Sequence, residues 1–146
     1  EITETIAGVR LRIVHFALTP SGDGFRAIQN PGLSETDIFD LFHTAEADLI
    51  CFGHLHPRRF NASHDGCHFL GPGSVGCSLD SLAHYATVDF VDGRFEISMQ
   101  SVPYERGELI ARYDRLEIPG RDFIRKRFLG VKEGEQSPPT YGSAEA

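Results

Sequence analysis

The sequence predicts an α/β fold, because a strand, a helix and a fully apolar strand follow one another in its first third. Residues 9–14 alternate apolar and polar side chains, residues 35–44 repeat apolar side chains at helical intervals, and residues 49–52 are apolar without alternation. A strand without alternation is typical of a sheet that is covered on both faces. The order β-loop-α-β predicts a right-handed crossover between parallel strands.

The elements around this unit carry clear boundary signals. Residues 1–6 are expected to pair with the strand at residues 9–16 across the turn Ala7-Gly8, with Val9, Leu11 and Ile13 on one face. Ser34 precedes Asp37 at the spacing of a capping box, so the helix is expected to begin directly after Ser34. The apolar face of this helix is expected to hold Ile38, Leu41 and Phe42.

The second half predicts antiparallel strands. Residues 59–63 and 67–70 flank a turn at residues 64–66. Residues 85–91 and 94–102 alternate around Asp92-Gly93, and an Asp-Gly pair between alternating runs is a strong hairpin signal.

Two helices are expected to follow these strands. The first covers residues 105–116, with Leu109, Tyr113 and Leu116 on one face, and the second covers residues 122–129. From residue 132 to residue 146 the chain has too little apolar surface to pack, which predicts a disordered tail. We therefore expect one folded domain over residues 1–131.

Composition excludes several function classes. The 146 residues are 40% hydrophobic and 24% charged, which suits a single globular core. A net charge of −7 argues against a surface for duplex DNA or an anionic membrane, and the short basic run at residues 125–127 is expected to be a solvated helix face. The sequence contains neither a signal peptide nor the roughly 18 consecutive apolar residues of a membrane helix, so a soluble, cytoplasmic protein is expected.

The three cysteines are expected to be free thiols. Cys51, Cys67 and Cys77 are odd in number and form no Cys-x-x-Cys pair, and two of them lie in apolar runs. The chain starts at Glu1 and its only methionine is Met99, so we also expect it to be a fragment of a longer protein.

Three histidines form the strongest candidate for chemistry. His54 and His56 directly follow the apolar strand at residues 49–52, and His15 ends the strand that begins at Val9. Imidazole nitrogens at strand ends are typical ligands of borderline transition metals, and Gly53 lets the main chain approach closely. The alternative is a pair of hydrogen-bonded surface histidines in a turn that Pro57 ends.

The order of the motifs resembles a known family. A strand ending in His15, a strand ending in Gly-His-Leu-His at residues 53–56, and Pro-Gly-Ser-Val-Gly at residues 72–76 resemble the C-terminal half of a calcineurin-like metallophosphoesterase. The resemblance covers residues 5–130. It implies a four-layer α/β/β/α sandwich, of which this chain would form the C-terminal half.

The resemblance also implies a site. His15 and His54 would bind one metal of a dinuclear centre and His56 the other, with two divalent ions (Mn, Fe, Zn or Ni) that bridge a water. The hydroxide formed from it would hydrolyse a phosphomonoester or a phosphodiester. The expected substrate is a phosphorylated small molecule or a nucleotide.

Two neighbouring segments are expected to border this site. Gly71, Gly73 and Ser74 belong to a loop that resembles the family's Asn-Pro-Gly-Ser loop, although Gly71 replaces the asparagine. Arg58 and Arg59 follow the histidine pair and could orient a phosphate. The alternatives are glycines that only satisfy a tight turn and arginines that are solvated charges at a strand edge.

The chain departs from the family in what it lacks. The Asp-x-His, Gly-Asp and Gly-Asn-His motifs of the family's first half are not present in the right order, so the bridging carboxylate would have to come from a missing N-terminal half. The chain alone is therefore expected to be inactive. Residues 101–105 and 118–120 further resemble bacterial predicted phosphodiesterases that are related to diadenosine polyphosphate hydrolases.

The histidine pair also occurs in proteins of other classes, which differ in the residues around it. A metallo-β-lactamase-type hydrolase requires His-x-His-x-Asp-His, whereas Pro57 and Arg58 follow here. A cupin would place the pair in an all-β barrel with no preceding helix, against the capping box at Ser34. An accessory or regulatory binding domain that keeps the fold and a partial histidine set remains the alternative to an enzyme.

Overall fold

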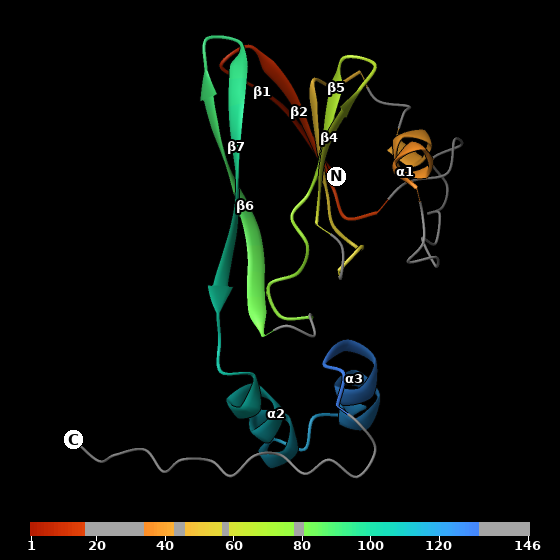
Figure 1. Cartoon of the computed structure of the whole chain (residues 1–146), viewed down its shortest axis with the longest axis vertical. Coiled ribbons are helices and arrows are strands. Elements are labelled where there is room, and N and C mark those ends of the chain that lie inside the picture. Colours follow the sequence, from red (N-terminus) through yellow and green to blue (C-terminus); the bar gives the residue numbers. More distant parts are fainter. Residues whose placement is uncertain (17–33, 43–45, 57–58, 78–80, 132–146) are drawn as a thin grey trace, which may run out of the picture. The chain divides into compact units, whose positions relative to one another are not determined.

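The computed structural model describes residues 1–16, 34–42, 46–56, 59–77 and 81–131 (Figure 1). The chain divides into two compact units. The first unit combines Glu1–Ser74 with His84–Gln100, and the second combines Val75–Ala83 with the chain from Ser101 onward.

The first unit is built on a five-stranded sheet with the order β1-β2-β3-β5-β4. Its strands are β1 (Ile2–Ile6), β2 (Val9–Val14), β3 (Leu49–Phe52), β4 (Phe60–His64) and β5 (Cys67–Gly71). The central strands β2, β3 and β5 are parallel, and the edge strands β1 and β4 pair antiparallel with β2 and β5. The predicted parallel pair of β2 and β3 is confirmed. The sequence did not predict that β5 also pairs with β3.

Two-residue turns set the register of the hairpins. Ile6 lies opposite Val9 across Ala7 and Gly8, and His64 lies opposite Cys67 across Asp65 and Gly66. Both residues of each turn have positive φ: 48° and 86° in the first, 47° and 78° in the second. This combination is the type I′ turn, whose twist matches that of the flanking strands.

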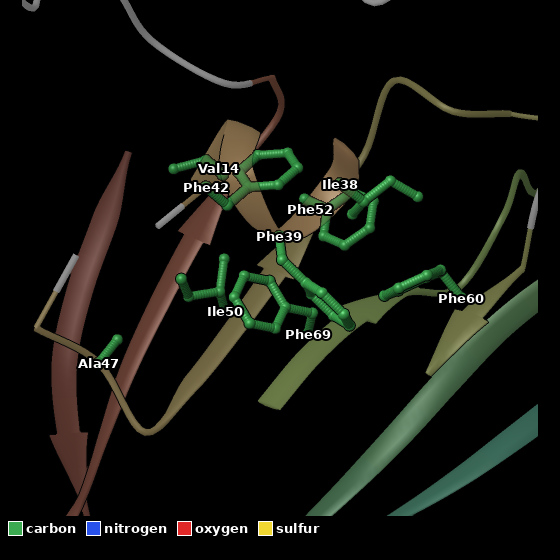
Figure 2. Close-up of a cluster of buried hydrophobic side chains, with 9 residues drawn as sticks. All are labelled: Val14, Ile38, Phe39, Phe42, Ala47, Ile50, Phe52, Phe60 and Phe69. Carbon is green, nitrogen blue, oxygen red and sulfur yellow. The ribbon is translucent and has the colours of Figure 1, made fainter. Parts of the chain in front are cut away.

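Helix α1 (Glu35–Phe42) covers one face of the sheet (Figures 1 and 2). The predicted capping box is confirmed, because the Ser34 N–H donates to Asp37 Oδ2 at 2.8 Å and the Asp37 N–H donates to Ser34 Oγ at 3.2 Å. The core under this helix is aromatic, and each fully buried large side chain in it stabilises the fold by about 1.5–3 kcal/mol. Its buried residues are Val14, Ile38, Phe39, Phe42, Ala47, Ile50, Phe52, Phe60 and Phe69.

The hairpin of β6 (Leu82–Val91) and β7 (Arg94–Pro103) packs on the opposite face of the sheet. Leu49 and Leu70 point to this face, whereas their neighbours Ile50 and Phe69 point to α1, as the alternation of a strand requires. The hairpin contributes the half-buried side chains Ala86, Val88, Phe90, Phe95, Ile97 and Met99. Helix, sheet and hairpin form three layers, so the predicted α/β class is confirmed.

The side chains on the predicted face of β2 differ in burial. Val9 and Leu11 are buried, but Ile13 on the same face is 40% exposed and Val14 on the other face is buried instead. Val14 is buried because it lies opposite Phe52 in the aromatic core under α1.

The second unit contains helices α2 (Arg106–Arg115) and α3 (Arg121–Phe128). Both lie within one residue of the predicted helices at each end. Ile110 is the buried residue of α2, whereas Leu116, which the helical spacing placed on the apolar face, is 62% exposed because the helix ends at Arg115. An ion pair of 2.8 Å between Arg125 Nη1 and Asp114 Oδ1 joins the two helices.

Three further expectations concern the cysteines, a membrane helix and the C-terminal tail. Cys51, Cys67 and Cys77 are free thiols, and each is half-buried. In the described ranges no helix is long and apolar enough to cross a membrane. The expected tail at residues 132–146 and the candidate substrate-binding residue Arg58 lie outside the part of the chain that the structure describes.

Candidate functional site

The three parallel strands end at one edge of the sheet, which we call the carboxyl edge. Val14 lies opposite Phe52, and Cys51 lies opposite Leu70, so the strands leave the sheet at the same level. His15 follows the first of these ends and Gly53 follows the second. Ligand sites in open α/β sheets form in crevices at such strand ends.

His15 and Gly53 are in direct contact at this edge. The Gly53 N–H donates to Val14 O at 3.2 Å and continues the pairing of β2 with β3. A Cβ on Gly53 would lie 2.8 Å from His15 Nδ1, which is closer than such atoms approach. A side chain at position 53 would therefore require the exposed ring of His15 to move.

His54 adopts a strained conformation next to this contact. Its φ is +69°, in the left-handed region that costs a residue with a Cβ about 1–2 kcal/mol. Two short-range hydrogen bonds hold the turn, from the Leu55 N–H to Gly53 O at 2.8 Å and from the His56 N–H to His54 O at 2.9 Å. The rings of His54 and His15 meet edge to face, with centroids 5.6 Å apart. Strain of this kind is concentrated at functional sites.

His56 completes a cluster of three imidazoles. Burial lowers the pKa of His56, and the positive charges of His15 and His54 lower this pKa further. This effect places His56 within electrostatic range of the other two imidazoles. The structure thus places His15 and His54 in contact at the carboxyl edge, and His56 lies two residues from His54. We call His15, His54 and His56 the histidine cluster.

The histidine cluster does not by itself form a complete metal site. Within the described residues, no three His, Cys, Asp or Glu side chains form a group that could hold a metal ion. Stable zinc sites use three or four protein ligands with fixed geometry. The described residues therefore do not provide a metal site by themselves.

The loop after β5 reaches the same edge, and we call its residues 71–74 the Gly73 loop. A Cβ on Gly71 would lie 2.7 Å from the ring of Phe52, which is buried and stacked on Phe42. This contact explains why position 71 holds glycine rather than the asparagine of the resembled loop. Gly73 has a φ of +96°, so it also satisfies the turn requirement that the sequence left as an alternative.

Arg59 contacts the hairpin through its guanidinium group. Its Nη2 donates to Gln100 O at 3.4 Å, and its side chain is exposed. His84, which no sequence motif singled out, lies against Gly73 and is 8% exposed. The sequence signal that could have identified His84 was its position just before the alternating run at residues 85–91.

The other described histidines of the sheet lie away from the cluster. His64 adjoins the turn at the opposite edge and stacks on Phe39 with ring centroids 4.4 Å apart. The ring nitrogens of His68 are hydrogen-bonded to Ser63 Oγ and to Asn61 Oδ1. A polar cavity of about 400 Å³ is lined by residues of this opposite edge, among them His64, and by none of the histidine cluster.

Comparison with known proteins gives a likeness in structure only. No family model and no curated protein matches the sequence. A hypothetical protein, PH1004 of Pyrococcus horikoshii OT3, is similar over 90% of this chain and 51% of its own, with a TM-score of 0.68 and 16% identity. This chain therefore spans about half the length of that protein.

Two further structures are similar at lower scores. Vps29 of Entamoeba histolytica, determined as a complex with zinc, has a TM-score of 0.44 and 13% identity over 69% of this chain and 58% of its own. Vacuolar protein sorting 29 of Cryptosporidium parvum has a TM-score of 0.37 and 12% identity over 70% of this chain and 56% of its own. These two likenesses are too weak to carry an argument, and the likeness to the archaeal protein is one of fold alone.

Proposed function

We propose that this chain supplies part of the divalent-metal centre of a calcineurin-like phosphoesterase. The observation that carries the proposal is the contact of His15 with His54 at the carboxyl edge, with ring centroids 5.6 Å apart, beside Gly53 and two residues from His56.

The proposed ligands of the centre come from two sources. His15 and His54 hold one ion and His56 the other, and the remaining ligands, including a bridging carboxylate, come from polypeptide outside these 146 residues. The imidazole-only donor set supports this division, because two ions need more ligands than three side chains provide. A pair of divalent ions suits phosphoester hydrolysis, because it stabilises both the attacking and the leaving oxygen.

The proposed substrate is a phosphomonoester or phosphodiester of a small molecule or nucleotide. The net charge of −7 disfavours a long polyanion such as duplex DNA, which requires a basic surface. A small substrate needs only local contacts at the carboxyl edge.

A second candidate is an accessory binding domain that keeps the fold without catalysis. The incomplete donor set of the described residues favours it as much as it favours a divided site. The two candidates differ in what happens when the missing ligands are supplied, because only the enzyme gains activity.

The test uses bis-p-nitrophenyl phosphate and Mn²⁺ with the protein extended by the coding sequence that precedes Glu1 in its gene. The proposal expects metal-dependent hydrolysis that falls by at least about a hundredfold in His54→Gln and in His56→Gln. His64→Gln is the matched control, because His64 lies at the opposite edge, and it should keep normal activity. Equal activity in His54→Gln and His64→Gln would exclude the proposed ligands, and an inactive extended protein would favour the accessory domain.

A further inference from the structure

Two segments of the first unit contact Gly73, and a third contacts one of them. A Cβ on this residue would lie 3.2 Å from His84 Cβ, in β6, and 3.3 Å from Arg59 Cγ, which precedes β4. Arg59 in turn donates from Nη2 to Gln100 O in β7. The loop that leaves the carboxyl edge is thus held between the start of β4 and the hairpin.

His84 is the main support of this loop. It is the one polar residue in the described ranges that is buried, with 8% of its surface exposed. Its N–H donates to Ser74 O at 2.9 Å, so main chain and side chain both contact the loop.

Arg59 supports the loop with its stem rather than with its charge. The Cγ atom is the part of Arg59 that approaches Gly73, and the guanidinium is directed to the main chain of β7. Long arginine stems commonly pack in this way while the head group stays in water. This arrangement separates two roles that the sequence could not separate, namely phosphate binding and loop support.

We propose that His84 and Arg59 are positioning residues, which hold the Gly73 loop in its left-handed conformation beside the histidine cluster so that its main chain borders the substrate's phosphate. This inference rests on the proposed function for the identity of the substrate. The contacts that hold the loop do not depend on it. A loop held at this place acts on substrate binding, because a displacement of about 1 Å near reacting groups is enough to reduce activity.

The first test measures kinetics in the extended protein with bis-p-nitrophenyl phosphate. His84→Ala and Arg59→Ala should each raise KM about fivefold or more, with kcat and the affinity for Mn²⁺ within about twofold of normal. Arg59→Met keeps the stem and removes the charge, so it should restore a nearly normal KM. If Arg59→Met is as impaired as Arg59→Ala, Arg59 binds phosphate through its charge and the proposal is wrong.

The second test measures amide hydrogen exchange at Gly73 and Ser74 in the 146-residue chain. Exchange should be faster in His84→Ala and Arg59→Ala and unchanged in Arg59→Met. Tyr85→Ala is the control, because Tyr85 is the exposed neighbour of His84 in β6. Unchanged exchange in His84→Ala overturns the proposal. Faster exchange without any hydrolysis by the extended protein supports the positioning role and overturns the proposed function alone.

Discussion

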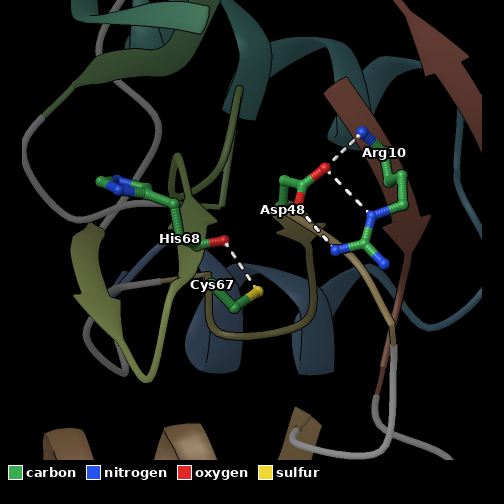
Figure 3. Close-up of polar contacts among 4 residues, drawn as sticks. All are labelled: Arg10, Asp48, Cys67 and His68. Atoms are coloured by element: carbon green, nitrogen blue, oxygen red, sulfur yellow. Dashed lines mark hydrogen bonds and ion pairs between the residues drawn. The ribbon is translucent and has the colours of Figure 1, made fainter. Parts of the chain in front are cut away.

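The two edges of the central sheet are built in opposite ways. At the carboxyl edge, three histidines crowd together, a glycine accommodates a neighbouring ring, and His54 is held at φ +69°. At the opposite edge, which we call the amino edge, tight turns and satisfied polar pairs prevail (Figure 3). There Arg10 donates to Asp48 from Nε at 3.1 Å and from Nη2 at 2.7 Å.

At the amino edge, main-chain hydrogen bonds link the three parallel strands. The Asp48 N–H donates to Arg10 O at 2.9 Å, and the His68 N–H donates to Asp48 O at 2.9 Å, so the ladder runs from β2 through β3 to β5. Arg10 lowers the pKa of Asp48 through its hydrogen bonds. The comparison teaches that imidazoles gather at the edge where the sequence predicts chemistry, whereas Arg10 and Asp48 pair opposite charges at the amino edge. Left-handed residues occur at both edges, because Ala7 and Asp65 in the amino-edge turns also have positive φ.

The largest expected effect tests whether the carboxyl edge lacks room for side chains. Gly71→Asn should destabilise the first unit by about 2–3 kcal/mol, because its Cβ would meet the buried ring of Phe52 and overpack the core. Gly66→Asn in the turn at the amino edge should cost less than about 1 kcal/mol, because no atom lies within 4 Å and asparagine tolerates positive φ. Urea denaturation measures both values, and equal losses would show that the edges do not differ in packing.

The second prediction concerns the strain at His54. His54→Gly should be more stable than His54→Ala by about 1 kcal/mol, because glycine adopts positive φ without strain. In helix α1 the order should reverse, with Asp40→Gly less stable than Asp40→Ala by about 1 kcal/mol. If His54→Gly is no more stable than His54→Ala in thermal unfolding, the turn is not strained.

Part of the fold could be predicted from the sequence, and part of it could not. The elements were predictable, because alternation, the capping box at Ser34 and the Asp-Gly turns are local signals. The pairing of β5 with β3 was not, since it joins segments that no local signal connects. The convergence of the histidine cluster followed from the parallel pair of β2 and β3, whereas the contact of His84 with Gly73 depends on how the hairpin packs on the sheet.

The third prediction uses the pH dependence of the amino edge. Burial lowers the pKa of His68 from its ordinary value of 6.5, so the unfolded chain binds a proton that the folded chain resists. The contribution of His68 to stability is therefore complete above about pH 6.5 and is lost as the pH falls through its lower pKa in the folded state. Denaturation curves between pH 8 and 5 should show a smaller loss in His68→Gln. An identical loss in both proteins would assign it to other groups.

The smallest expected effect lies in the first turn. Ala7 occupies a left-handed position, with φ 48°, that Asp65 and Asp92 occupy in the other two hairpins. Ala7→Asn should stabilise the chain by about 0.5 kcal/mol, because asparagine favours the first central position of a type I′ turn. Ala7→Val should destabilise it, because β-branched residues resist positive φ. Differential scanning calorimetry resolves the two directions, and a stabilising valine would mean that the turn is not type I′.

The most direct measurement of the central claim is a calorimetric titration of Mn²⁺ and Zn²⁺ into two proteins. One is the 146-residue chain, and the other includes the coding sequence that precedes Glu1. If the histidine cluster is part of a divided metal centre, the chain alone binds weakly, the longer protein binds tightly, and His54→Gln reduces the tight binding by about ten- to a hundredfold or more. Tight binding by the 146-residue chain that His54→Gln leaves unchanged would contradict the account.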